Sequence, residues 1–340
     1  MARPIAGRVA PGQRRPIGAA ASGQIAVGEP GTARIAVDLL GGDHAPAVVV
    51  DGALRACQAD PALHLLLVGP LEAAGAVLDA LDPADHARVS SLPVAAAEGE
   101  SGAEPAVRAA VLAVVQARAD AVLSAGDTRA TVLSAALGLG RWPGVRRPPL
   151  AAVLPTAEGR LVLLDVGSSV DADERTLLTH ARLGAAYAAA VHDVPQPRVG
   201  LLTIGTEHGK GDRLRRALPP RFAALDLPAG ARYAGLVEGN DVVSGSVADV
   251  VVTDGFTGNV LLKGLETAYA RLGLPNQAGP GAGLSRAAVL LGVSGTVVVC
   301  HGAASGSDVA AGIAFAAQLH RRAAVAAMAE MITANEVSHE

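Results

Sequence analysis

Residues 34–46, "RIAVDLLGGDHAP", decide the fold. The stretch begins as an unbroken apolar run, which is typical of a strand buried on both faces of a parallel sheet. It then turns polar and glycine-rich, at the point where such a strand leads into a helix. Glycines allow a tight turn and a close approach of the backbone, and the polar side chains there can face a ligand. The polar and glycine residues of the stretch are Asp38, Gly41, Gly42, Asp43 and His44.

The same organisation repeats along the chain. Short apolar runs predict strands at 34–38, 64–68, 88–92, 121–125, 150–154, 161–166, 199–204, 248–253 and 296–300. Ala-rich amphipathic stretches predict helices at 47–58, 71–81, 104–117, 128–139, 173–192, 258–272 and 309–334, and the Gly/Pro loop at 272–286 is expected to lead into a further short helix. The alternation predicts an α/β fold with a mainly parallel sheet and helices on both faces. Residues 33–335 are expected to form a single domain, and 1–32 a disordered tail.

Composition narrows the classes of function. The 340 residues carry a net charge of −4 and only 2% are aromatic, so neither charge nor base-stacking side chains point to a nucleic-acid partner. Cys57 and Cys300 lack metal or disulfide spacing and are expected to be small buried side chains. No apolar run reaches the ~18 residues of a membrane span. A cytoplasmic location is therefore expected.

Polar, glycine-rich loops follow six of the predicted strands. They are "VDLLGGDHAP" (37–46), "SAGDTRA" (124–130), "LDVGSSVD" (164–171), "TIGTEHGKGD" (203–212), "TDGFTGN" (253–259) and "CHGAASG" (300–306). Because parallel strands end at the same edge of a sheet, the six loops are expected to converge on one polar cleft. Each loop alone is equally consistent with turn chemistry, in which the acids cap or brace a turn and the other charged residues are solvated. This alternative applies to Asp38, Asp165, Asp254, His44, His301, Lys210 and Lys263.

Common cofactor and hydrolase motifs are missing from the sequence. No predicted strand runs into G-x-G-x-x-G or a P-loop, no G-x-S-x-G is present, and no two histidines have H-x-x-x-H spacing. Dinucleotide binding, serine hydrolysis and a metal site are therefore not predicted. In "GTEHGKGD", by contrast, three glycines surround Lys210, and backbone N–H groups beside one cation suit an anion.

The motifs together resemble the PlsX family, the phosphate acyltransferases of bacterial phospholipid synthesis. The resemblance rests on "DLLGGDHAP", "SAGDT", "LGRWPGVRRP", "LLDVGSSVD", "PRVGLLTIGTEHGKG", "VEGNDVVSG", "VVVTDGFTGNVLLK" and "LLGVSGTVVVCHGA", which occur in the family's order and spacing. It extends from about residue 34 to about residue 320. It implies a three-layer α/β/α fold similar to the isocitrate/isopropylmalate-dehydrogenase-like and phosphotransacetylase folds.

The resemblance also implies a reaction. Inorganic phosphate attacks the thioester of a long-chain acyl group on acyl carrier protein, and the products are acyl phosphate and the free carrier protein. No cofactor is needed, the enzyme is a homodimer, and a glycerol-3-phosphate acyltransferase uses the product. Because phosphate is already an anionic nucleophile, the site has to hold it beside the thioester carbonyl and stabilise the oxyanion.

Motif match and this chemistry assign the candidate residues. Lys210 and His301 are expected to hold phosphate, with Asp254 and Asn259 completing the catalytic set, while amides of the "DGFTGN" and "GGDH" turns stabilise the oxyanion. The expected substrate-binding residues are Asp38, Gly41, Gly42, Asp43, His44, Gly126, Asp127, Thr128, Arg129, Asp165, Gly167, Gly205, Glu207, Gly255, Thr257, Gly258 and Lys263.

The chain departs from the family pattern at four places. Pro105 and Ala106 replace a pair of serines, Asp127 and Arg129 replace Asn and Gly, and Ser169 replaces Asn. The family's longer helical segment shrinks to the loop 273–285, which lacks the length and apolar face of an interfacial helix. Peripheral membrane association is therefore not expected.

The sequence leaves two alternatives open. Asp127 and Arg129 are expected to neutralise each other, and the alternative is that Asp127 caps the helix while Arg129 is solvent-exposed. The alternative function is that of a divergent or non-catalytic relative which binds an acyl carrier protein or another acyl thioester.

Overall fold

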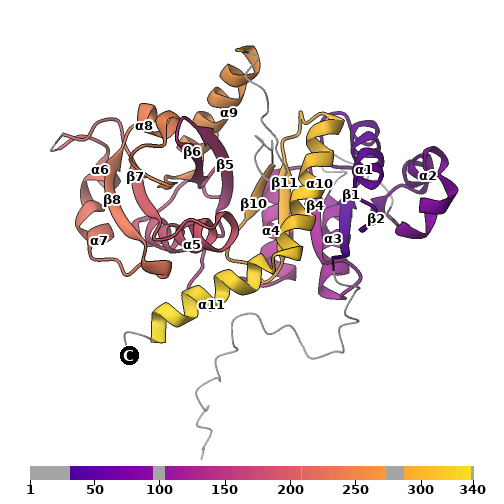
Figure 1. Ribbon diagram of the computed structural model, residues 1–340, viewed down its shortest axis with the longest axis horizontal. Coiled ribbons are helices and arrows are strands. Elements are labelled where there is room, and N and C mark those ends of the chain that lie inside the picture. Colours follow the sequence, from indigo (N-terminus) through magenta and orange to yellow (C-terminus); the bar gives the residue numbers. More distant parts are fainter. Residues whose placement is uncertain (1–30, 95–103, 208, 273–286, 338–340) are drawn as a thin grey trace, which may run out of the picture.

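The computed structural model describes residues 31–94, 104–207, 209–272 and 287–337 (Figure 1). Its strands are β1 (Ala33–Asp38), β2 (Leu63–Gly69), β3 (Val89–Pro93), β4 (Ala121–Ser124), β5 (Leu150–Thr156), β6 (Gly159–Leu164), β7 (Arg198–Leu202), β8 (Arg232–Val237), β9 (Val250–Val252), β10 (Ala287–Leu290) and β11 (Thr296–Cys300). Its α-helices are α1 (Ala47–Ala59), α2 (Leu71–Ala80), α3 (Glu104–Val115), α4 (Thr128–Gly138), α5 (Glu174–His192), α6 (Arg213–Ala217), α7 (Pro219–Ala223), α8 (Gly239–Ser244), α9 (Gly255–Arg271), α10 (Gly306–Arg321) and α11 (Ala324–Val337).

The described strands form one sheet in the order β3-β2-β1-β4-β11-β10-β5-β6-β9-β7-β8. The strands from β3 to β11 are parallel to their neighbours, and so are those from β6 to β8. Between the two groups, β10 is antiparallel to β11 and to β5, and β5 is antiparallel to β6. The predicted α/β class with a mainly parallel sheet is confirmed, and the sheet has an antiparallel centre.

This antiparallel centre corrects the prediction that all six polar loops leave the same edge of the sheet. Across it the chain direction reverses an odd number of times, so β6, β9 and β7 run opposite to β1, β4 and β11. The loops after β1, β4 and β11 therefore leave one edge of the sheet, and the loops after β6, β7 and β9 leave the other. The six polar loops form two groups rather than one.

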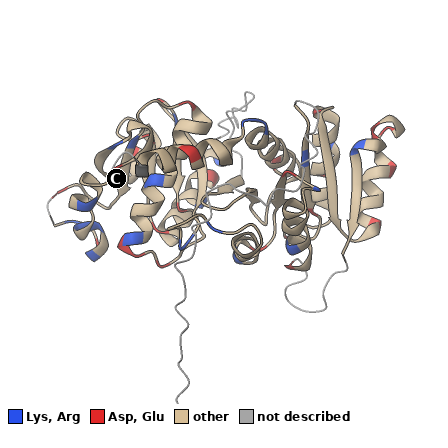
Figure 2. Ribbon diagram, turned by 90° about the horizontal axis from the view of Figure 1, so that it is seen from below, with Lys and Arg blue, Asp and Glu red and all other residues tan. Residues whose placement is uncertain are grey.

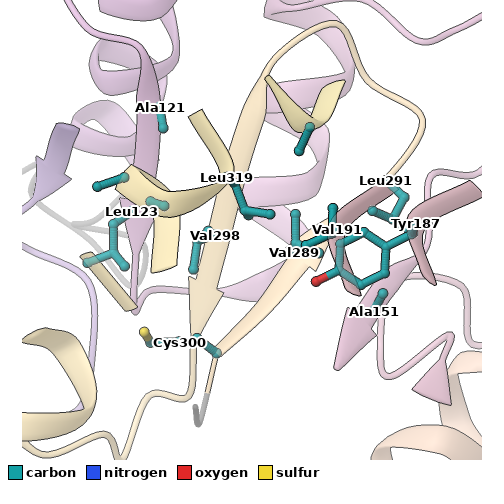
Figure 3. Close-up of a cluster of buried hydrophobic side chains, with 14 of the residues drawn as sticks. Ala121, Leu123, Ala151, Tyr187, Val191, Val289, Leu291, Val298, Cys300 and Leu319 are labelled. Carbon is teal, nitrogen blue, oxygen red and sulfur yellow. The ribbon is translucent and has the colours of Figure 1, made fainter. Parts of the chain in front are cut away.

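Helices cover both faces of the sheet, because successive strand residues point to opposite sides. One face buries Ile35, Leu123 and Val298 under α1, α2, α5, α10 and α11, and Figure 3 shows this core around Tyr187. The other face buries Ala36, Val122 and Val299 under α3, α4, α8 and α9. Figure 1 shows α1 and α10 side by side on the first face.

The short helices α6, α7 and α8 were not predicted, and three further elements also differ from the sequence prediction. The predicted helix at 309–334 is two helices, because Ala323 has a φ of 49° in the left-handed region and separates α10 from α11. The chain after residue 286, predicted to be helical, is strand β10. Strand β8 is not predicted, since most of its residues are only half-buried and its apolar signal is weak. Residues 1–30 of the expected tail at 1–32 and residues 273–286 of the Gly/Pro loop lie outside the described residues.

Candidate functional site

The loops after β1, β4 and β11 are joined through Asp38. This carboxylate is buried, accepts hydrogen bonds from the Leu40 amide (3.0 Å) and from Ser124 Oγ (2.7 Å), and so ties β1 to β4. Burial raises the pKa of Asp38 to about 6, although these hydrogen bonds oppose the shift. Asp38 is thus a buried brace between two strands, as the structural alternative suggested.

Glycines allow these loops to touch. A Cβ on Gly41 would lie 2.5 Å from the Gly126 amide nitrogen, and Gly42 has a φ of 116° that favours glycine. The Asp43 amide donates to the Gly302 carbonyl at 2.8 Å, which joins the loop after β1 to the loop after β11. The side chains of Asp43 and His44 are exposed to solvent.

Asp165 organises the second group of loops, at the other edge. It is fully buried and accepts from the amides of Leu150 (3.1 Å), Gly167 (3.1 Å), Ser168 (3.0 Å) and Ser169 (2.6 Å). Four backbone donors on one carboxylate fix the turn after β6. Asp165 therefore braces this loop.

Asp254 holds the start of α9. It accepts from the Thr257 amide and from Thr257 Oγ1, both at 2.8 Å, and from the buried guanidinium of Arg215. Burial alone would raise the pKa of Asp254, but the hydrogen bonds from Arg215 and Thr257 outweigh it and lower the pKa. Arg215 was not singled out from the sequence. A carboxylate so fully bonded is a structural ion-pair partner rather than an accessible acid or base.

Glycine is required where α9 meets the turn after β6. The Gly255 amide donates to the Ser169 carbonyl at 2.8 Å. A Cβ on Gly258 would lie 2.0 Å from the Asp165 carbonyl oxygen, and one on Gly167 would lie 3.1 Å from Asn259 Nδ2. The "DGFTGN" motif thus packs α9 directly on the turn after β6.

The loop after β7 lies apart from the pocket described next. Glu207 and Lys210 are exposed, and the Lys210 amide donates to the Glu207 carbonyl at 3.0 Å. Gly205 is buried, and a Cβ there would lie 2.6 Å from Glu207 Oε2. Lys210 is not among the residues that line the pocket containing His301.

A pocket with a cavity volume of about 120 Å³ lies on the face covered by α4 and α9. Its apolar part is lined by Leu150, Ala152, Val166, Leu262, Ala287, Ala288, Val299 and Cys300. Its polar part is lined by Thr128, Asn259, Lys263, Glu266, His301 and Gly302. The pocket therefore brings the loop after β11 to α9, which begins in the other group of loops. Of the predicted catalytic residues, it contains His301 and Asn259.

Side chains of α9 form half of the polar lining of the pocket. Glu266 Oε1 lies 3.3 Å from His301 Nε2, and Asn259 Nδ2 donates to the Val166 carbonyl at 3.0 Å. Asn259, Lys263 and Glu266 are spaced by four and three residues, so they share one side of the helix. Asn259 and Lys263 were predicted from the sequence, and this spacing could have added Glu266.

The structure also decides between the alternatives for Asp127. Its Oδ1 accepts from the Ala130 amide at 2.7 Å and caps α4, while Arg129 is exposed. Among the described residues no ion pair joins Asp127 to Arg129. The expected neutralising pair is therefore wrong, and the capping alternative is correct. Thr128, between them, lines the pocket.

Charged residues outside the pocket are spread over the chain. Lys and Arg (blue) and Asp and Glu (red) are scattered along the ribbon in Figure 2. Within the described ranges, no group of three or more His, Cys, Asp or Glu side chains is arranged to hold a metal ion. Over the same ranges, no helix has both the length and the apolar character to cross a membrane. Cys57 and Cys300 are buried as predicted, and burial raises both thiol pKa values, that of Cys300 to about 12.

Most of this chain is similar in sequence to known proteins. Residues 33–273 match the sequence profile of the family described as "Fatty acid synthesis protein". The chain is 41% identical over 310 residues to a phosphate acyltransferase of Thermobifida fusca, covering 81% of this chain and 84% of that protein. It is 36% identical over 334 residues to one of Heliobacterium modesticaldum, covering 88% and 97%.

Solved structures of low sequence identity share the fold. The EutD phosphotransacetylase of Staphylococcus aureus matches with a TM-score of 0.56 at 18% identity, covering 88% of this chain and 95% of that one. A branched-chain phosphotransacylase of Enterococcus faecalis matches with a TM-score of 0.57 at 16% identity, covering 84% and 99%. These matches support the predicted fold class alone. The family profile and the full-length relatives show that the chain belongs to the fatty acid synthesis protein family, the PlsX family that its strand-end motifs resemble.

Proposed function

We propose that the protein is a phosphate acyltransferase that transfers a long-chain acyl group from acyl carrier protein to inorganic phosphate. The observation that carries the proposal is the pocket between α4 and α9, where an apolar lining meets Lys263, His301 and Asn259. An acyl thioester and an anion are the two groups that such a pocket would hold side by side. The names of the curated relatives support the same reaction.

The chemistry needs few catalytic groups. Lys263 would attract the phosphate dianion, and binding beside the thioester replaces an encounter in solution with a reaction of two oriented groups. A phosphate oxygen attacks the carbonyl carbon, and the carbon–sulfur bond breaks as the acyl–oxygen bond forms. The phosphate proton ends on the carrier sulfur, so the products are acyl phosphate and the carrier thiol.

His301 would relay this proton. Glu266 holds one ring nitrogen at 3.3 Å, which fixes the orientation of the ring. The other ring nitrogen can then take the proton from phosphate and give it to sulfur. The amides of the first turn of α4, whose residue Thr128 lines the pocket, would stabilise the oxyanion.

The proposal includes two partners beyond the substrates. Acyl phosphate is an activated acyl donor, so an acyltransferase that uses glycerol 3-phosphate would consume it. We also expect a homodimer, which light scattering would detect.

The test is release of carrier protein from palmitoyl carrier protein, measured with and without phosphate, together with detection of palmitoyl phosphate. The proposal predicts phosphate-dependent release and a rate about 10²- to 10⁴-fold lower in His301→Gln. Release at the same rate without phosphate would indicate a thioesterase. Binding of palmitoyl carrier protein without any release would instead favour the non-catalytic relative.

A further inference from the structure

Helix α4 carries an exposed stripe beside the pocket. Arg129, Leu133 and Leu137 are four residues apart and therefore lie along one side of the helix. Leu133 is 52% exposed and Leu137 is 75% exposed, which is high for leucine. The opposite side of α4 is buried through Thr131 and Ala135. The stripe thus faces away from the sheet.

Helix α3 carries a matching stripe. Arg108 is exposed, as are Leu112 (49%) and Val115 (53%), at spacings of four and three residues. The two helices pack closely, since a Cβ on Gly138 of α4 would lie 2.5 Å from Val111 Cγ1 of α3. Six exposed residues of the two helices form the α3–α4 surface: Arg108, Leu112, Val115, Arg129, Leu133 and Leu137. The acidic Glu104 at the start of α3 is exposed as well.

The charge of this surface is not neutralised within the described part of the chain. Neither Arg108 nor Arg129 forms a salt bridge with a described residue. In particular, Arg108 forms none with Glu104, which lies one turn before it on α3. Two guanidinium groups beside exposed leucines suit a partner with acidic side chains around an apolar one. A second copy of this chain fits less well, because a twofold axis would bring like-charged arginines together.

The surface adjoins the pocket. Thr128 lines the pocket and begins α4, and Leu133 lies only about 7–8 Å further along the helix at 1.5 Å per residue. A carrier docked here would present its thioester to the pocket that Thr128, Lys263 and His301 line. We propose that the α3–α4 surface is the docking site for the acyl carrier protein, bound through acidic and apolar side chains of the carrier. This inference rests on the proposed function.

Binding can be tested without turnover. Fluorescently labelled palmitoyl carrier protein is titrated with wild type, Arg108→Glu, Leu137→Gln and the control Arg175→Glu, and anisotropy is measured. Arg175 is an exposed arginine on α5, which covers the opposite face of the sheet. Arg108→Glu is expected to weaken binding about tenfold and to reduce its salt dependence, because it replaces an attraction by a repulsion. Arg175→Glu is expected to stay within about twofold of wild type.

Steady-state kinetics with two thioester donors distinguish a role in docking from a role in catalysis. With palmitoyl carrier protein, Arg108→Glu and Leu137→Gln should raise KM and leave kcat unchanged. With palmitoyl-N-acetylcysteamine, a thioester without the carrier, both variants should match wild type. Absence of turnover by wild type with either donor would refute the proposed function, while the anisotropy titration would still test the surface.

Three results would overturn the docking proposal. They are an unchanged carrier affinity in both surface variants, an equal loss of rate with both thioesters, and a dimer that dissociates in Leu137→Gln by light scattering. The last would mean that a second copy of the chain covers this surface.

Discussion

Replacing Arg215 by methionine should destabilise the protein by removing the cation from a buried ion pair. Arg215 is 9% exposed and donates to Asp254, to Thr253 Oγ1 at 3.0 Å and to the Leu202 carbonyl at 3.3 Å. The substitution leaves Asp254 with only the two hydrogen bonds from Thr257. Breaking a buried pair costs about 3–5 kcal/mol, and since Thr257 still solvates the carboxylate, a loss of about 3 kcal/mol is expected.

The effect of pH on this loss has a definite sign. The folded-state pKa of Asp254 lies below its usual 3.8, so the ionised carboxylate stabilises the wild type above that pH, and this contribution is lost as the pH falls through the folded-state pKa. In Arg215→Met the carboxylate is buried without a cation, so its protonation relieves the penalty. The difference in unfolding free energy between wild type and variant should be largest at neutral pH and should shrink towards pH ~4.5.

Urea unfolding followed by far-UV circular dichroism at both pH values measures this difference. Arg216→Met is a matched control, because Arg216 is exposed and its side chain donates to the Gly211 carbonyl, with no described carboxylate as partner. It should change stability by no more than about 0.5 kcal/mol. A loss below about 1 kcal/mol in Arg215→Met, or a loss equally large at both pH values, would refute the reasoning.

Other substitutions test the turns that position the pocket. Gly258→Ala should lower Tm, because its Cβ would lie 2.0 Å from the Asp165 carbonyl oxygen, whereas Gly264→Ala on the same helix has open space and should raise stability by about 0.5–1 kcal/mol. Since burial raises the pKa of Asp38 from 3.8 to about 6, stability should fall by up to about 3 kcal/mol as pH rises through this interval, and Asp38→Asn should abolish that part of the urea-unfolding pH profile. Asp127→Ala should cost about 1 kcal/mol of stability through loss of the α4 cap, and any change in phosphate dependence would contradict its assignment as a cap only.

Much of the fold could be predicted from the sequence, because burial of a strand on both faces leaves consecutive apolar residues such as 35–37. The direction of the central strands could not be predicted from the sequence. The four-residue run "AAVL" of β10 is too short for periodicity to separate strand from helix, and pairing direction leaves no local signal. That strand reverses the sheet and splits the six loops into two groups.

The site was predicted in part for similar reasons. His301 and Asn259 were found because they follow strands, and Lys263 because it lies in a family motif. Arg215 lies in "RLRRA" between exposed arginines, and only tertiary packing decides which one is buried. Asp165 was predicted to bind substrate and Asp254 to belong to the catalytic set. The backbone hydrogen bonds of Asp165 and the Arg215 and Thr257 hydrogen bonds of Asp254 make both carboxylates braces.

The phosphate dependence of acyl phosphate formation in Lys263→Gln and Lys210→Gln tests the central claim most directly. Lys263 lines the pocket, and Lys210 is an exposed lysine outside it. Loss of one charge-assisted contact costs about 1.5–3 kcal/mol, so Lys263→Gln should raise the phosphate concentration for half-maximal rate by roughly 10- to 150-fold, with Lys210→Gln close to wild type. A shift of that size in Lys210→Gln, with Lys263→Gln unchanged, would contradict the account and place the phosphate in the loop after β7.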